Sequence, residues 1–380
     1  MVAGIREGWF RHYVIPVERV PDIQKDEGPL AVMSPGQIRQ CAMRILYQDA
    51  TVSAEFFHSL TDGYGGTEFL KALLAEYLKL AHGVDCLEDK YTPLVSCPDS
   101  LAETTDSYAL YAWEDQGAPR SQLSYMPVGE RSSDTAPHTT TAIFDADAVL
   151  QAARSYHTTL TGFLTAVMAK SVMEIQLRRR TKTQRPVQIM VPVNLRKLFP
   201  SKTLRNFSLY ALPGIRREDM GLPFERLSAK VTAQLNQQLS SEALHAMLAS
   251  NHRLQRRFQW LPLSLKCAAL RFSFRLFAGK TSSITLSNMG TFTVPPKMYP
   301  YIKRVDFLLT PRLYSDYNCG LITFDGRLYI NFTRRCVAPE LEFCFFEKLC
   351  KMNCVPDLEV DGVSISHQNI YDYLGKDVPI

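Results

Sequence analysis

One short segment, FFHSLTDGYGG at residues 56–66, constrains the fold of this chain more than any other. Two apolar-rich runs before it, residues 43–47 and 52–57, flank the turn-like residues QDA, and this pattern predicts a β-hairpin. After the segment, apolar residues recur at helical spacing and form one stripe of an amphipathic helix, namely Phe69, Leu70, Leu73, Tyr77 and Leu78. We expect this helix to have Thr67 as its N-cap and Gly83 just past its end. His58 is therefore predicted at the C-terminal end of a strand, ahead of a glycine turn into a helix.

The size and composition of the chain indicate a globular protein with two parts. A chain of 380 residues exceeds the usual size of one hydrophobic core, so two domains or one two-lobed unit is expected. The net charge of +5 is too small and too dispersed along the sequence to indicate nucleic-acid binding. No apolar run is long enough to predict a membrane span, and the first residues lack the apolar core of a signal peptide. Because no export signal is found, we expect a cytoplasmic protein with reduced cysteines.

The rest of the chain mixes strands and helices. Alternating or apolar runs predict strands at residues 139–144, 187–194, 282–290 and 305–310, and helical spacing predicts helices from about Asp147, from about Thr161 and after Pro223. The clearest hairpin is residues 320–334, because Asp325-Gly326 suits a two-residue type I′ turn. Residues 84–137, rich in Pro, Ser, Asp and Thr, are expected to form a long surface connection between lobes. The fold class is therefore α/β or α+β with a substantial mixed sheet.

His58 is the candidate for acid–base chemistry. A histidine at a strand end is fixed by the sheet and still able to point into a cleft, and its neutral imidazole accepts protons near neutral pH. Asp62 follows after the chain has begun to turn, and a carboxylate that faces away from His58 needs its own cationic partner. Gly63, Gly65 and Gly66 remove side-chain bulk where the backbone bends. The spacing alone does not distinguish this site from a structural histidine beside a glycine turn.

Three sequence blocks together resemble a known superfamily. HSLTDG resembles the His-x-x-x-Asp-Gly signature shared by chloramphenicol acetyltransferases, peptide-synthetase condensation domains and acyl-CoA-dependent alcohol acyltransferases. VPVNLRKLFPSKTLRNFSLYALPGI, residues 191–215, is similar to the block in which a strand ends in an arginine and an Asn-Phe segment follows. TLSNMG, residues 285–290, is similar to the Ser-Asn-x-Gly strand end of those proteins. The resemblance spans nearly the whole chain and is closest to bacterial alcohol acetyltransferase-like proteins.

The resemblance implies a two-lobed α/β fold of the chloramphenicol acetyltransferase type, with a channel between the lobes. Residues 1–137 would form the N-terminal lobe together with the linker between the lobes, and residues 138–380 the C-terminal lobe. The implied activity is transfer of an acyl group from an acyl-CoA, or from a carrier-bound thioester, to an alcohol or amine. Acetyl-CoA or another acyl-CoA would be the co-substrate, an acyl carrier protein is an alternative donor, and no metal or permanently bound cofactor is implied.

The resemblance also implies roles for single residues. His58 would be the general base, Asp62 and Arg196 would form a structural ion pair between the lobes, and Gly63 would be the glycine of the motif. The remaining candidates would stabilise the oxyanion of the tetrahedral intermediate or line the channel; these are Ser287, Asn288 and Asn206.

The chain departs from the superfamily pattern beside His58, at its N-terminus, and in lacking the Asp-Phe-Gly-Trp-Gly block of plant alcohol acyltransferases. Phe57 stands where condensation domains usually carry a second histidine, which argues against a peptide-synthetase partner. Only 57 residues precede His58, fewer than is usual, so we expect an N-terminally incomplete first lobe. A first lobe of this kind keeps a second hypothesis open, in which the chain is a catalytically silent module that binds an acyl carrier or a lipid.

Residues 251–280 alternate cations with large apolar residues. We expect a pair of helices packed on the sheet with a basic outer face. The same pattern also suits a peripheral membrane contact or contacts with the phosphates of coenzyme A.

Overall fold

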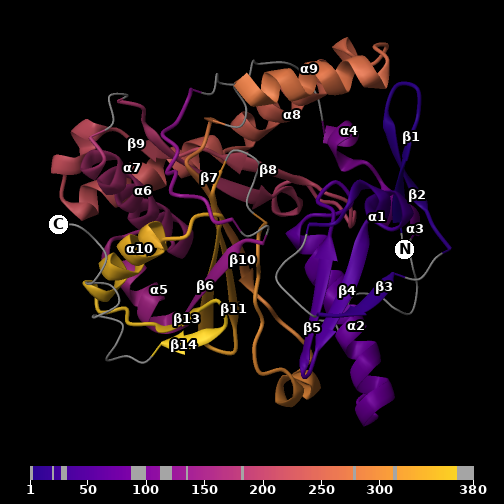
Figure 1. Ribbon diagram of the computed structural model, residues 1–380, viewed down its shortest axis with the longest axis horizontal. Coiled ribbons are helices and arrows are strands. Elements are labelled where there is room, and N and C mark those ends of the chain that lie inside the picture. Colours follow the sequence, from indigo (N-terminus) through magenta and orange to yellow (C-terminus); the bar gives the residue numbers. More distant parts are fainter. Residues whose placement is uncertain are drawn as a thin grey trace.

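The computed structural model describes residues 3–18, 21–26, 32–86, 100–111, 122–133, 136–180, 184–276, 280–310 and 315–365. Within these residues, helices flank three β-sheets in a mixed α/β molecule (Figure 1). A small sheet has the order β3-β4-β5, and its strands are β3 (Asp22–Lys25), β4 (Met43–Gln48) and β5 (Thr51–Phe56). A separate hairpin joins β1 (Ala3–Glu7) to β2 (His12–Pro16), and α1 (Pro35–Gln40) precedes β4.

The large sheet has nine strands in the order β14-β13-β6-β12-β11-β10-β7-β8, with β9 also paired to β7. Its strands are β6 (His138–Asp145), β7 (Val187–Asn194), β8 (Ser208–Ala211), β9 (Gly214–Ile215), β10 (Ile284–Thr291), β11 (Tyr317–Phe324), β12 (Arg327–Arg334), β13 (Asp357–Val360) and β14 (Val363–Ile365). Because β10 runs parallel to β7 and β11 whereas the other pairs are antiparallel, the sheet is mixed, as the sequence predicts.

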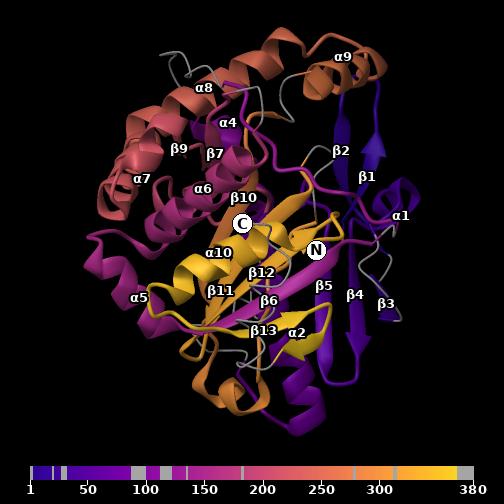
Figure 2. The same ribbon diagram turned by 60° about the vertical axis from the view of Figure 1, so that its left-hand side comes forward.

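The two faces of the large sheet carry separate hydrophobic cores. The main core lies under four helices, which are α5 (Ala146–Ser155), α6 (Leu160–Arg178), α7 (Phe224–Gln238) and α10 (Glu340–Cys350). The central helix α6 is buried on nearly all sides, which its apolar sequence favours. On the other face, Ile322, Phe324 and Tyr329 pack with Ala75 and Leu78 of α2 (Gly63–His82), so α2 connects the small sheet to the large one (Figures 1 and 2).

Most of the elements predicted from the sequence are present. The hairpin around residues 43–57 is β4 and β5, and the Asp325-Gly326 turn between β11 and β12 has the positive φ angles of a type I′ turn. Gly83 has the left-handed conformation expected just past the end of α2. The strand predicted at residues 305–310 is wrong, because this segment joins no sheet.

The N-terminus of α2 also differs from the prediction. Asp62, not Thr67, is the N-cap: its carboxylate accepts a hydrogen bond from the Gly65 N–H, and the helix begins at Gly63. The three glycines therefore form the first helical turn instead of a separate turn. A capping carboxylate stabilises the first turn and offsets part of the poor helix propensity of the three glycines.

Two further predictions concern the surface. Residues 84–137 are not only a surface connection: their described parts include α3 (Ser100–Thr104), α4 (Ser107–Tyr111) and Tyr125, which lies in the main core. After α8 (Ser241–Arg257), the helix α9 (Leu263–Leu276) does not pack on the sheet, since none of its described side chains is buried.

In the part of the chain that the structure describes, no helix is long and apolar enough to cross a membrane. The described cysteines all carry free thiols.

Candidate active site

His58 lies in the loop between β5 and α2, which we call the motif loop (residues 57–62). The residue is exposed, and its Nδ1 lies 3.1 Å from the side-chain nitrogen of Asn206. The same Asn206 nitrogen donates a hydrogen bond of 3.0 Å to the backbone oxygen of His58. Asn206 precedes β8 of the large sheet, so His58 is held where the small and large sheets approach each other.

Asp62 is buried at the other end of the motif loop and accepts three hydrogen bonds. Its Oδ1 accepts from the Gly65 N–H at 3.1 Å, and its Oδ2 accepts from the Phe207 N–H at 2.8 Å. Oδ2 also lies 2.7 Å from Nη1 of Arg196, and both side chains of this ion pair are about 95% buried (side-chain exposure 5% and 6%). The carboxylate thus fixes the start of α2 and binds the large-sheet part of the molecule at the same point.

Arg196 organises the segment that follows β7. It lies in a 3₁₀ turn (Leu195–Lys197), and its guanidinium donates to the backbone oxygens of Thr203 and Arg205 at 2.8 and 2.5 Å. The ring of Tyr64 lies 4.7 Å from the guanidinium carbon, a cation–π contact. Burial, reinforced by the charge of Glu68, raises the pKa of Tyr64, so its phenol stays protonated beside the cation. Arg196 therefore closes the loop over residues 197–205 and joins it to the motif loop.

Thr61 adds a link that the sequence analysis did not identify. Its Oγ1 donates a hydrogen bond of 2.6 Å to the backbone oxygen of Leu204, so three residues of the motif loop bind residues 194–207. A hydroxyl in the variable part of a His-x-x-x-Asp-Gly segment gives no signal in a single sequence.

The other candidates lie on a neighbouring strand, β10. The motif glycine Gly63 faces its end so closely that a Cβ at this position would lie 2.4 Å from Sδ of Met289. Ser287 is buried, and the Asn288 amide donates to Thr161 Oγ1 at 3.0 Å and accepts from the Gly290 N–H at 2.8 Å. Among the described residues, neither of them bonds to His58. The structure therefore brings His58, Asn206, Asp62 and Arg196 together and places Ser287 and Asn288 on β10 nearby.

Comparisons with known proteins bear on the fold. Neither a protein-family model nor a curated protein matches this sequence. Among solved structures, F. graminearum TRI101 complexed with coenzyme A and deoxynivalenol is similar at TM-score 0.61 and 11% identity, over 95% of this chain and 88% of that one. The trichothecene 15-O-acetyltransferase TRI3 of Fusarium sporotrichioides is similar at TM-score 0.52 and 12% identity, over 87% and 75%. Polyketide synthase associated protein 5 of Mycobacterium tuberculosis is similar at TM-score 0.50 and 13% identity, over 92% and 86%.

The chain has the two-lobed chloramphenicol acetyltransferase-like fold. In this fold the motif loop, residues 194–207 and the end of β10 converge. The three sequence blocks that resemble the superfamily lie on these elements.

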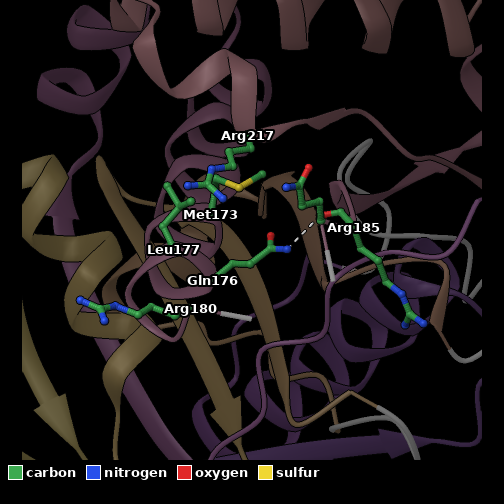
Figure 3. Close-up of a pocket in the computed structure, with 7 residues that line it drawn as sticks. Met173, Gln176, Leu177, Arg180, Arg185 and Arg217 are labelled. Atoms are coloured by element: carbon green, nitrogen blue, oxygen red, sulfur yellow. Dashed lines mark hydrogen bonds between the residues drawn. The ribbon is translucent and has the colours of Figure 1, made fainter. Parts of the chain in front are cut away.

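A pocket of about 400 Å³ lies elsewhere in the acetyltransferase-like fold (Figure 3). Its lining residues come from the C-terminal end of α6 and from the residues around it: Met173, Gln176, Leu177, Arg180, Gln184, Arg185 and Arg217. Arg185 precedes β7 and Arg196 follows it, so the eight-residue strand separates the two positions by roughly 26 Å. The pocket is therefore distinct from the surroundings of His58.

The packing around Gly65 gives a first testable prediction. A Cβ at Gly65 would lie 2.2 Å from Thr61 Oγ1 and 2.4 Å from the Leu204 oxygen, and this backbone oxygen cannot easily move aside. We expect Gly65→Ala to lower the free energy of unfolding by about 1–3 kcal/mol, measured by urea unfolding. Gly221→Ala is the matched control, because a Cβ there meets nothing within 4 Å. Equal stability of the two variants would contradict close packing of Gly65 against Thr61 and Leu204.

Proposed function

We propose that this chain is an acyltransferase that moves an acyl group from an acyl-CoA, or from a carrier-bound thioester, to an alcohol or amine. One observation carries the proposal: an exposed imidazole stands in a loop that a buried aspartate and arginine hold in place. The fold adds support, since one similar structure contains coenzyme A and another is that of an acetyltransferase.

In the proposed reaction, the acceptor hydroxyl or amine attacks the thioester carbonyl while His58 takes its proton. The tetrahedral intermediate collapses with cleavage of the C–S bond, and the imidazolium returns the proton to the departing thiolate. Ser287 and Asn288 are the candidates for stabilising the oxyanion. Asn288 donates one N–H to Thr161, and an amide nitrogen carries two, so one donor is left for this task.

Asn206 decides which imidazole nitrogen carries the proton. An amide nitrogen only donates, so Nδ1 of His58 accepts, and the neutral ring bears its proton on Nε2. Abstraction of a proton at Nε2 requires the other tautomer, with Nδ1–H facing the amide oxygen. A rotated amide would also bring Oδ1 against the His58 backbone oxygen, which now accepts from the Asn206 nitrogen at 3.0 Å, so rotation loses that hydrogen bond. We therefore expect Asn206 to act as a positioning residue that holds the resting tautomer of His58, and its contact with Nδ1 to break before Nε2 accepts a proton.

The tautomer is open to direct measurement. In ¹⁵N spectra of protein labelled at histidine, we expect the His58 proton on Nε2 in the wild type and on Nδ1 in Asn206→Asp, because a carboxylate accepts from Nδ1–H. Asn206→Ala, which neither donates nor accepts, is the control and should give a mixture. A wild-type signal with the proton on Nδ1 would contradict the role of the amide.

The activity itself is tested by release of free thiol from acetyl-CoA in the presence of alcohols and amines. We expect release that depends on an acceptor and continues over many turnovers. Acyl-pantetheine thioesters serve as a second donor series, since they represent the arm of a carrier protein. If the chain binds these donors and no acceptor promotes thiol release, the proposal fails and the catalytically silent binding module is supported instead.

A further inference from the structure

Two exposed segments, far apart in the sequence, meet on one side of the molecule. The turn between β1 and β2 carries Trp9 and Phe10, and the turn between α8 and α9 follows Phe258. The backbone N–H of Leu263 donates to the oxygen of Trp9 at 2.8 Å, and Nζ of Lys266 donates to the oxygen of Phe10 at 2.8 Å. Figures 1 and 2 both show the tip of this hairpin beside α9. The two turns thus form one continuous surface.

Large apolar side chains on this surface are unusually exposed. Trp9 is 88% exposed and Trp260 is 78% exposed, although burial of an indole is strongly favourable. We define the aromatic patch as the exposed large apolar residues of these two turns and the first turn of α9, namely Trp9, Phe10, Phe258, Trp260, Leu261 and Leu265. A contiguous group of this kind marks a surface that interacts with a partner or a membrane.

The charges near the aromatic patch are mostly positive. Exposed cations close to it in sequence include Arg11, Arg256, Arg257 and Arg271, and no ion pair joins any of them to a described residue. Residues 243–305, which include all of α9 and most of α8, contain no aspartate or glutamate. Glu7, on the hairpin, lies 4.0 Å from Arg39. A partner of this surface must therefore offer an apolar layer for indole rings and negative charge for arginines.

We propose that the aromatic patch docks on an anionic phospholipid membrane. Tryptophan rings favour the level of the lipid headgroups, and arginines beside them bind headgroup phosphates. A second copy of the chain fits less well, because a twofold contact through the same surface would bring cations against cations. An acidic carrier protein would pair with the arginines, but two widely exposed indoles favour a lipid layer over a folded protein surface. Membrane docking is a property separate from acyl transfer.

Sedimentation with vesicles tests this proposal without any turnover. We expect binding to vesicles of equal parts phosphatidylglycerol and phosphatidylcholine to be about tenfold tighter, or more, than binding to phosphatidylcholine alone. Added salt should weaken the binding to anionic vesicles, because it screens the arginines. Since two of the three tryptophans lie in the aromatic patch, tryptophan emission should shift to shorter wavelength when anionic vesicles are added.

Two double variants separate the contribution of the tryptophans to vesicle binding from that of the arginines. Trp9→Ser/Trp260→Ser should lower the affinity for anionic vesicles about tenfold or more. Arg256→Gln/Arg257→Gln should remove most of the preference for anionic over neutral vesicles, because each lost charge lowers the affinity for anionic vesicles about fivefold. Leu80→Ser is the matched control, since Leu80 is 85% exposed on α2, and should bind as the wild type does. All of these residues are exposed, so melting temperatures should stay unchanged and show that the variants fold.

Three results would overturn the proposal. The first is equal retention by anionic and neutral vesicles, and the second is wild-type binding by the Trp9→Ser/Trp260→Ser variant. The third is a wild type that ignores vesicles and instead forms dimers, or binds an acidic carrier protein, through contacts that the tryptophan variant loses.

Discussion

His58→Ala is expected to lower the rate of acceptor-dependent thiol release by about 10²–10⁴-fold, the range that loss of a general base gives. The melting temperature should not change, because His58 is exposed and its side chain forms one hydrogen bond, to Asn206. A large loss of rate with no loss of stability is the combination that distinguishes a catalytic histidine from a structural one. Thiol release under saturating donor, together with a thermal melt of the same sample, measures both quantities.

His12→Ala serves as the matched control for this prediction. His12 is also exposed, but it lies in the β1–β2 hairpin and forms no hydrogen bond or ion pair with the motif loop among the described residues. It should retain wild-type activity and stability. Equal thiol release by wild type and His58→Ala would show that the assignment of His58 as the base is wrong. A fall in the melting temperature of His58→Ala in step with its rate would favour the structural interpretation of the histidine.

Local sequence patterns predicted many of the helices, strands and turns, because these elements depend on residues close together in the sequence. The Asp325-Gly326 turn needs two residues that tolerate positive φ, and the sequence supplies them between two apolar strands. The apolar run of α6 and the alternation of β7 likewise depend only on residues within each element. Such features are visible in one sequence.

Contacts between distant residues decide the features that the sequence left open. Asp62 and Arg196 are 134 residues apart, so their pairing was expected only from the resemblance to the superfamily and not from spacing. Asn206 and Thr61 give no periodic signal, so their bonds to His58 and Leu204 were not predictable from spacing. The amphipathic stripe of α9 looks the same whether the apolar side faces a sheet or solvent, and for this reason its packing was predicted wrongly.

Breaking the ion pair of Asp62 and Arg196 is expected to cost more stability than loss of any other polar contact of the motif loop. Asp62→Asn keeps the size of the side chain, but it removes the charge and leaves a buried guanidinium without its counterion. Breaking one side of a buried pair costs about 3–5 kcal/mol. We expect a loss of this size in the free energy of unfolding, measured by urea unfolding, and a lower melting temperature.

The variant should also lose activity at temperatures at which it is still folded. The Asp62 carboxylate fixes the first turn of α2 and the Phe207 N–H, and Phe207 follows Asn206, which binds His58. Loss of these bonds displaces the imidazole from the segment that positions it. A misplacement of about 1 Å is enough to lower an enzymatic rate about 10²-fold, so thiol release at low temperature should fall well before unfolding does.

Matched controls make the Asp62 prediction specific. Glu347→Gln breaks an exposed pair with Lys351, which lies just past the end of α10, and such a pair contributes only about 0.2–0.5 kcal/mol. The double variant Asp62→Asn/Arg196→Met should be more stable than the sum of the two single changes predicts, because it removes both buried charges. If the effects of the two single changes add without coupling, or if Asp62→Asn melts at the wild-type temperature, the pair does not hold the lobes together.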